Sequence, residues 1–191
     1  MRLLCLMLAT LLAACSSTTP VTETYLLRST PVDGSKTELM NSGIAIDNIQ
    51  VAPYIDQPGL VLATGDGKVQ SARHHLWAEP LQVSLRRFFT EKISAASKQD
   101  ISAFPSASTL ARIDVRIDQL HGESSGALLV AYWSISAGDD IQRHRFSQRQ
   151  ALSSGGYDAL VAAEEALLSR LATAIADSLP VDHTVDSAGD G

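Results

Sequence analysis

The sequence predicts an α+β fold: a two-layer domain with a mainly antiparallel sheet and two amphipathic helices on one face. Several segments alternate apolar and polar residues with the two-residue period of a half-buried strand. Two longer segments repeat apolar residues with the period of a helix. Short turns separate the last three strand segments, and this favours a meander of adjacent antiparallel strands.

The strands expected before the first helix are short. In the second of them the apolar phase slips by one residue at Asp47 and Asn48, which indicates a β-bulge. A turn-rich segment, Pro53–Gly59, follows that strand, and Gly65-Asp66-Gly67 marks a further turn. The expected strands span residues 25–27, 44–51, 60–62 and 68–75.

The first helix is expected from Glu79 to about Ala96. Pro80 suits the first turn of a helix, because its missing N–H needs no partner there. The apolar residues of this segment fall on one helical face. They are Leu81, Leu85, Phe88, Phe89, Ile93 and Ala96.

The second half of the chain predicts three strands and a long helix. Leu110–Leu120 alternates most clearly, Ala127–Ser136 is apolar on both faces, and Ile141–Leu152 is a polar return strand. Tyr157–Leu179 carries a leucine-rich stripe at helical spacing, and Pro180 ends it. Within the second strand, Trp133 has the parity of the core face. Tyr132 projects from the opposite face, where an apolar patch would need a partner chain or a lipid.

The chain start resembles a bacterial lipoprotein signal. Residues 1–14 combine Arg2 with an apolar run that is too short to span a membrane. The run ends in Leu-Ala-Ala-Cys, which resembles the lipobox of lipoprotein precursors. The resemblance implies cleavage before Cys15 and attachment of acyl chains, such as palmitate, to this residue. Ser16 then favours the outer membrane over the inner one. The alternative is an ordinary signal peptide with an incidental cysteine.

These boundaries divide the chain into four parts. Residues 1–14 are the signal peptide, residues 15–24 the acylated cysteine with a Ser/Thr-rich flexible tether, and residues 25–180 a single α+β domain. Residues 181–191 are polar, and we expect a disordered tail.

Composition and motifs exclude several functions. A net charge of −6 argues against binding nucleic acid through general basicity. With 2 Cys, neither a disulfide scaffold nor a cysteine-based zinc site is available. The adjacent His74 and His75 point to opposite faces of a strand, so a shared metal is awkward. Because no G-x-S-x-G elbow or other catalytic spacing occurs, we expect neither an enzyme nor a cofactor.

Several motifs occur in an order that resembles one family. They are Tyr-Leu-Leu at 25–27, YIDQPGLV at 54–61, LWAEPL at 76–81 and Tyr-Asp-x-Leu-Val at 157–161, in addition to the lipobox. Together they resemble the ABC-type transport auxiliary lipoprotein family. The resemblance implies a lipoprotein on the periplasmic face of the outer membrane. Its implied partners are a periplasmic MCE-domain protein and an inner-membrane permease complex, and some relatives form rings.

We therefore expect a non-enzymatic subunit of a lipid-transport or membrane-integrity system, which docks the channel protein to the outer membrane. A homo-oligomeric ring is one arrangement that the resemblance implies. The alternatives are a periplasmic lipid-binding carrier, a structural envelope lipoprotein without a transport partner, and a hydrolase with an unrecognised site. The residues expected to contact a partner or a second copy are Tyr54, Asp56, Pro58, Leu60, Trp77 and Tyr132. Trp77 is also a candidate core anchor for the first helix.

Overall fold

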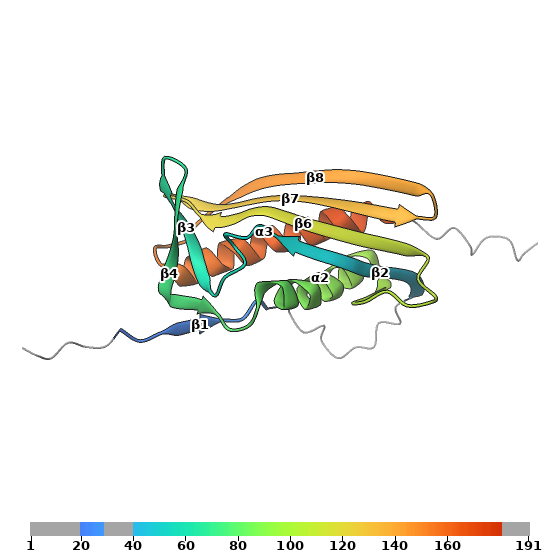
Figure 1. Ribbon diagram of the computed structural model, residues 1–191, viewed down its shortest axis with the longest axis horizontal. Coiled ribbons are helices and arrows are strands. Elements are labelled where there is room, and N and C mark those ends of the chain that lie inside the picture. Colours follow the sequence, from blue (N-terminus) through green and yellow to red (C-terminus); the bar gives the residue numbers. More distant parts are fainter. Residues whose placement is uncertain (1–19, 29–39, 181–191) are drawn as a thin grey trace, which may run out of the picture.

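The computed structural model describes residues 20–28 and 40–180, and these form an α+β domain (Figure 1). The predicted signal peptide, Cys15 and the tail at 181–191 lie outside the described residues, as do residues 16–19 of the tether. The strands are β1 (Glu23–Tyr25), β2 (Met40–Val51), β3 (Gly59–Gly65), β4 (Lys68–Trp77), β5 (Gln99–Ser102), β6 (Ala111–Gly122), β7 (Gly126–Ala137) and β8 (Asp140–Ala151). The helices are α2 (Leu81–Ser97) and α3 (Tyr157–Asp177).

The sheet is mixed. The predicted meander is present, because β6, β7 and β8 pair in antiparallel order, as do β3 and β4. However, β2 runs parallel to both β5 and β6, and β1 runs parallel to β4. Parallel neighbours need a long crossover connection, and here the chain between β2 and β5 includes the β3–β4 hairpin and α2. The expectation of a mainly antiparallel sheet therefore holds for the meander and the hairpin, but not for the strands around β2.

The predicted bulge in β2 is confirmed. The register between β2 and β6 shifts between Ile46 and Asn48, so that Asp47 is the extra residue. A bulge bends its strand and leaves backbone groups outside the ladder.

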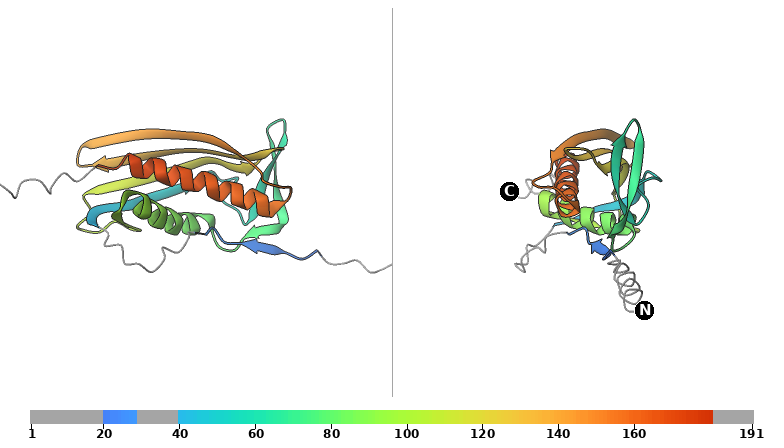
Figure 2. Two further views of the ribbon diagram at one scale, coloured as in Figure 1. Left: turned by 180° about the vertical axis from the view of Figure 1, so that it is seen from behind. Right: turned by 90° about the vertical axis from the view of Figure 1, so that its left-hand side faces the viewer.

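Both helices pack through the predicted apolar stripes, except that Ala96 at the end of the stripe in α2 is exposed. In α2 the side chains of Leu85, Phe88, Phe89 and Ile93 are buried, and in α3 the leucine-rich stripe is buried as well. α2 begins at Leu81 rather than at Glu79, because Pro80 has an extended ψ of 128°. The helices contact each other, and seen from behind both lie in front of the strands (Figure 2, left).

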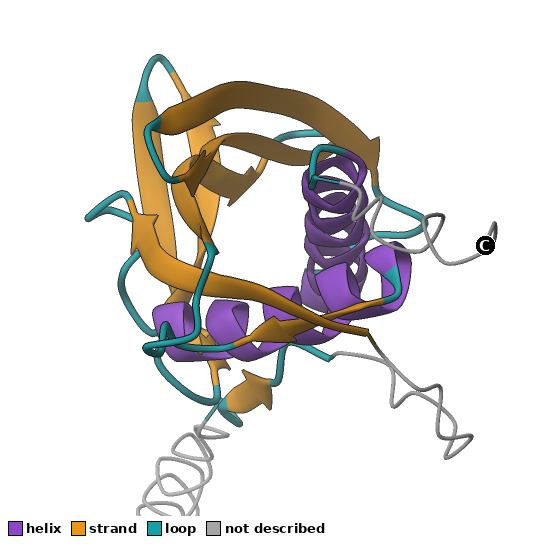
Figure 3. Ribbon diagram, turned by 90° about the vertical axis from the view of Figure 1, so that its right-hand side faces the viewer, coloured by secondary structure: helices purple, strands orange, loops and turns teal. Residues whose placement is uncertain are grey.

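The strands curve around the core. Seen along the long axis, the strands and the two helices together enclose it (Figure 3). The prediction for Trp133 is confirmed, since this residue is 7% exposed and its indole N–H donates to Ser178 Oγ at the end of α3, at 3.0 Å. No helix within residues 20–28 and 40–180 is both long and apolar enough to cross a membrane.

The first strand is held at the edge of β4. β1 has three residues, and Tyr25 pairs with Trp77 at its end. Tyr25 Oη lies 2.9 Å from Glu23 Oε2 and 3.0 Å from His75 Nδ1. The His75 ring in turn stacks on Tyr157 of α3, with ring centroids 3.8 Å apart. These contacts connect the strand that follows the tether to the last helix.

Candidate functional site

The segment that carries the predicted contact residues Tyr54 to Leu60 lies beside Trp77, which is another of them. The backbone N–H of Trp77 donates to the Pro58 carbonyl at 2.7 Å, and Gly59 pairs with Leu76 across the β3–β4 ladder. Residues 56–58 and 77–81 line a hollow of about 350 Å³. We call this the turn hollow. Three of the six predicted contact residues, Asp56, Pro58 and Trp77, thus line one hollow, while Tyr54, Leu60 and Tyr132 lie outside it.

The predicted residues differ in exposure. Asp56 and Pro58 are exposed at the rim, and Tyr54 is half-buried. Leu60 is 1% exposed and Trp77 is 7% exposed, so both side chains belong mainly to the core. Asp56 and Pro58 can therefore contact a partner directly. Leu60 and Trp77 are core residues that support the segment from inside the domain.

The rim of the turn hollow is fixed by polar contacts. Ile55 and Asp56 both donate their backbone N–H to the Ala52 carbonyl. Gln82 Nε2 of α2 donates to Asp56 Oδ2 at 3.3 Å. On the far side, Glu79 accepts hydrogen bonds from Arg87 and Ser84, and the Arg87 guanidinium lowers the pKa of this carboxyl. The hollow is therefore a pre-organised surface rather than a loose loop.

A buried polar cluster lies behind Tyr54. Tyr54 Oη is 3.0 Å from His121 Nδ1, and burial lowers the pKa of His121, which favours the neutral ring. Burial also raises the pKa of Tyr54, with the charges of Asp118 and Glu164 as smaller causes. Glu164 is 2% exposed, and burial raises its pKa to about 8. The cluster orients Tyr54 and holds no serine or cysteine nucleophile.

The described residues show no metal site. In the ranges 20–28 and 40–180, no three His, Cys, Asp or Glu side chains are grouped so that they could hold a metal ion. His74 lies near Thr22, while His75 stacks on Tyr157, so the two adjacent histidines face different surroundings, as expected for a strand.

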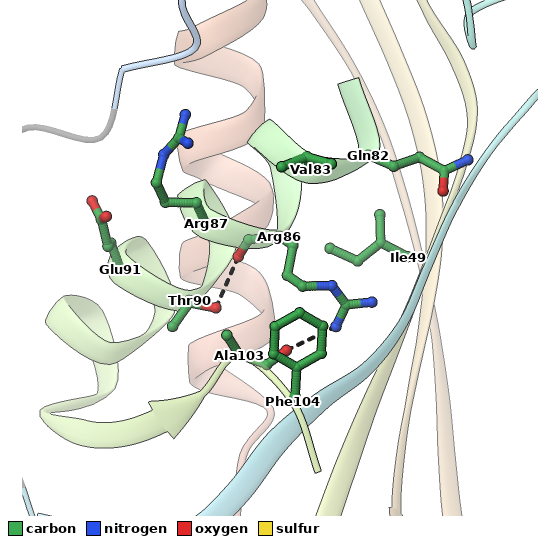
Figure 4. Close-up of a pocket in the computed structure, with 9 residues that line it drawn as sticks. All are labelled: Ile49, Gln82, Val83, Arg86, Arg87, Thr90, Glu91, Ala103 and Phe104. Carbon is green, nitrogen blue, oxygen red and sulfur yellow. Dashed lines mark hydrogen bonds between the residues drawn. The ribbon is translucent and has the colours of Figure 1, made fainter. Parts of the chain in front are cut away.

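An apolar groove on α2 was not anticipated from the sequence. It has a volume of about 450 Å³, and Figure 4 shows Ile49 of β2, Val83 of α2 and Phe104 around it. Val83 is 55% exposed and Phe104 is 67% exposed. The Arg86 guanidinium lies 4.7 Å from the Phe104 ring centroid. The one signal in the sequence is Phe104, an isolated aromatic residue before Pro105 in a segment without strand or helix periodicity.

Arg86 fixes this groove to the β2 bulge. Its guanidinium donates to the carbonyls of Ile46 at 2.9 Å and Ala103 at 2.8 Å, and also to that of Asp47 at 3.3 Å. One side chain thus satisfies the backbone groups that the bulge displaces, and it also covers Phe104.

The surroundings of Tyr132 are polar, not apolar. The Tyr132 ring lies between the guanidinium groups of Arg116, 4.9 Å from its centroid, and Arg145, 6.0 Å from it. The outward residues beside it on β6 and β7 include Asp114 and Ser134. The apolar patch expected on this face is therefore replaced by an arginine-rich one, because β6 and β8 place polar side chains opposite the apolar residues of β7.

Comparison with known proteins gives the family. The model of the ABC-type transport auxiliary lipoprotein component family matches residues 25–176. The Intermembrane transport lipoprotein PqiC of Escherichia coli (strain K12) is 26% identical over 136 residues, which cover 70% of this chain and 73% of that protein. The protein of the same name from Shigella flexneri matches to the same extent.

Two solved structures share the fold. A crystal structure of an uncharacterized protein matches with a TM-score of 0.72 and 20% identity, covering 83% of this chain and 98% of that one. A crystal structure of a protein from Xanthomonas campestris matches with a TM-score of 0.62 and 16% identity, covering 81% and 92%. Since the family model spans the whole described domain from β1 to α3, the chain belongs to the family of ABC-type transport auxiliary lipoprotein components.

Proposed function

We propose that this chain is a non-enzymatic subunit of a lipid-transport system that docks a periplasmic MCE-domain channel protein to the outer membrane. Acyl chains on Cys15 hold it at the periplasmic face of that membrane. The observation that carries the proposal is the family match over residues 25–176, because the family comprises auxiliary lipoproteins of ABC-type transport. The Leu-Ala-Ala-Cys motif supports the anchor.

The turn hollow is the proposed contact surface for the channel protein. Its rim combines the exposed Asp56 and Pro58 with backbone fixed by hydrogen bonds, so that little conformational entropy is lost on binding. The inner-membrane permease complex is then an indirect partner through the channel protein. Copies of this chain arranged as a ring would present several such rims to one channel end.

Site-specific photo-cross-linking tests this contact. A photoreactive residue at position 56 or 58 of the acylated chain is expected to capture an MCE-domain protein in cells, as identified by mass spectrometry. The matched control is position 66, at the exposed tip of the β3–β4 hairpin. Capture of an MCE-domain protein from position 66 but not from 56 or 58 would show that the contact surface is the tip of the β3–β4 hairpin and not the turn hollow. Capture of this chain alone from all three positions, with an efficient cross-linker, would favour a structural role.

A lipid carrier is the second candidate, favoured by the groove on α2. The space between the sheet and the helices is filled by side chains such as Phe88 and Phe89. The surface groove on α2 is therefore the candidate site for an acyl chain. The carrier hypothesis predicts phospholipid that co-purifies at a fixed ratio with the Cys15→Ala chain and is lost on Phe104→Asp. A chain purified without bound phospholipid would exclude this function.

A further inference from the structure

The outward face of β6, β7 and β8 concentrates positive charge in an acidic protein. Cross-strand pairing places Arg116, Tyr132 and Arg145 in one row across the three strands. The next row contains Asp114, Ser134 and Arg143. The chain as a whole carries a net charge of −6. This arginine face therefore has the sign opposite to that of the molecule.

Two arginines of this face have no acidic partner. The other three are paired: Arg112 with Asp47 at 3.3 Å, Arg116 with Asp118 at 2.9 Å and Arg149 with Glu123 at 2.8 Å. Within the described part of the chain, neither Arg143 nor Arg145 forms an ion pair, and both are exposed. They lie two residues apart on β8, so both guanidinium groups project from the same face. Two forks of hydrogen-bond donors are thus available to an external anion.

A hollow of about 460 Å³ is lined by Arg143, while Arg145 lies outside its lining and contacts Tyr132 at its edge. Its lining supplies mostly side chains that donate hydrogen bonds: Asn48, Gln50, Arg116, Tyr132, Ser134 and Arg143. Such a set suits an anion that has several acceptor oxygens, and guanidinium groups bind phosphate oxygens in pairs. A single carboxylate would leave most of this volume empty, whereas a phosphodiester with its attached glycerol fills more of it.

We propose that the arginine face binds the phosphate groups of phospholipids at a membrane surface, with Arg143 and Arg145 as the main contacts. The choice of a membrane rests on the proposed acylation of Cys15. Between Cys15 and Glu23 lie residues 16–22, a length that keeps β1 within about 25 Å of the bilayer. This range brings the domain to the membrane, and the positive charge of the arginine face favours the orientation in which that face meets the headgroups.

Asp114 makes the proposal more specific. This carboxylate also lines the hollow, where it repels an anion. Burial and the nearby Asp47 raise its pKa, while Arg112 lowers it. Removing the Asp114 charge is therefore expected to strengthen phosphate binding, an effect opposite to that of removing an arginine.

Vesicle binding by residues 15–191 with Cys15→Ala tests the proposal, because neither the apolar run of the predicted signal peptide nor an acyl anchor then contributes. The probe is a vesicle of phosphatidylethanolamine and phosphatidylglycerol, with flotation as the readout. Arg143→Ala combined with Arg145→Ala is expected to weaken binding roughly 30-fold, and Asp114→Asn to strengthen it a few-fold. Arg73→Ala, at an exposed arginine of β4, is the matched control and is expected to leave binding unchanged. Thermal melting verifies that each variant is folded.

Four results would overturn the proposal. They are absence of vesicle binding by the Cys15→Ala chain, unchanged binding by the double arginine variant, an equal loss in Arg73→Ala, and binding of soluble glycerophosphate without binding of vesicles. The last result would assign the face to a soluble phosphate compound. Cross-linking from position 56 is read separately, so the docking function and the arginine face can fail independently.

Discussion

At the scale of single residues, Glu164 couples the stability of the domain to pH. Its pKa in the folded chain is about 8, against 4.5 for the unfolded chain. Between these values the folded chain keeps a proton that the unfolded chain releases, so the free energy of unfolding falls as the pH rises through this window. Below pH 4.5 the carboxyl group is protonated in both states and does not change the free energy of unfolding. Above pH 8 it is ionised in the core, and its cost to the free energy of unfolding is greatest.

Glu164→Gln removes this dependence while it keeps the size of the side chain. We expect the variant to be more stable than the natural chain by on the order of 2 kcal/mol at pH 8, and about equally stable at pH 4. Urea unfolding at both pH values measures the difference. Glu91→Gln, on a less buried part of α2, is the matched control. An unchanged pH slope in Glu164→Gln would show that this carboxyl is not the source of the dependence.

Arg86 is the second residue whose role can be tested alone. Arg86→Ala leaves the Ile46 and Ala103 carbonyls without this donor and uncovers Phe104. We expect a loss of about 1–3 kcal/mol in the free energy of unfolding, measured with urea. Arg87→Ala breaks only a more exposed pair with Glu79, and a loss of about 1 kcal/mol or less is expected. Equal losses in the two variants would contradict the special role of Arg86.

At the scale of elements, the periodicity of apolar residues predicts those features that depend on residues close together in the chain. The apolar stripes of α2 and α3 and the bulge in β2 follow from spacing within one segment, and the meander follows from the short turns between its three strands. The four-residue strand β5 was missed, because Ile101 is its one buried side chain and no alternation can be detected. The parallel pairing of β2 was missed for another reason: it joins segments far apart in the chain, and local periodicity carries no information about such partners.

The same reasoning applies to the candidate sites. The turn hollow could be anticipated, since each of its two segments is a continuous motif. The groove on α2 is built from β2, α2 and the segment after β5, each of which contributes one or two apolar side chains. The arginine face depends on the register between β6, β7 and β8, which fixes whether the charges share one face.

At the scale of the whole molecule, the question is how the domain is held in the envelope. We expect the natural chain in the membrane fraction. A Cys15→Ala chain exported behind an ordinary cleavable signal peptide is expected mostly in the soluble periplasmic fraction, because the acyl chains supply most of the membrane affinity and the arginine face adds a weaker, salt-sensitive contact. Cys5→Ala is the matched control and is expected to behave like the natural chain, since residue 5 precedes the predicted cleavage. Fractionation followed by immunoblotting measures the distribution.

If the sequence carries an ordinary signal peptide instead, the natural chain and Cys15→Ala will both be soluble. If Cys15→Ala remains in the membrane fraction and the double arginine variant releases it, the arginine face is a second membrane contact. The two attachments can therefore be separated with the same assay.

The pairing of β1 with β4 has a mechanical consequence. A tether fixed to a membrane and a domain fixed to a channel protein would transmit any relative movement through β1 (Figure 1). A pull along this strand loads its short ladder in shear, so that the paired residues resist together instead of opening one by one. Behind the ladder, the ring of His75 between Tyr25 and Tyr157 passes the load into the longest helix. The three-residue strand would then be the first part to yield, and the extra chain released would act as slack that spares the folded domain.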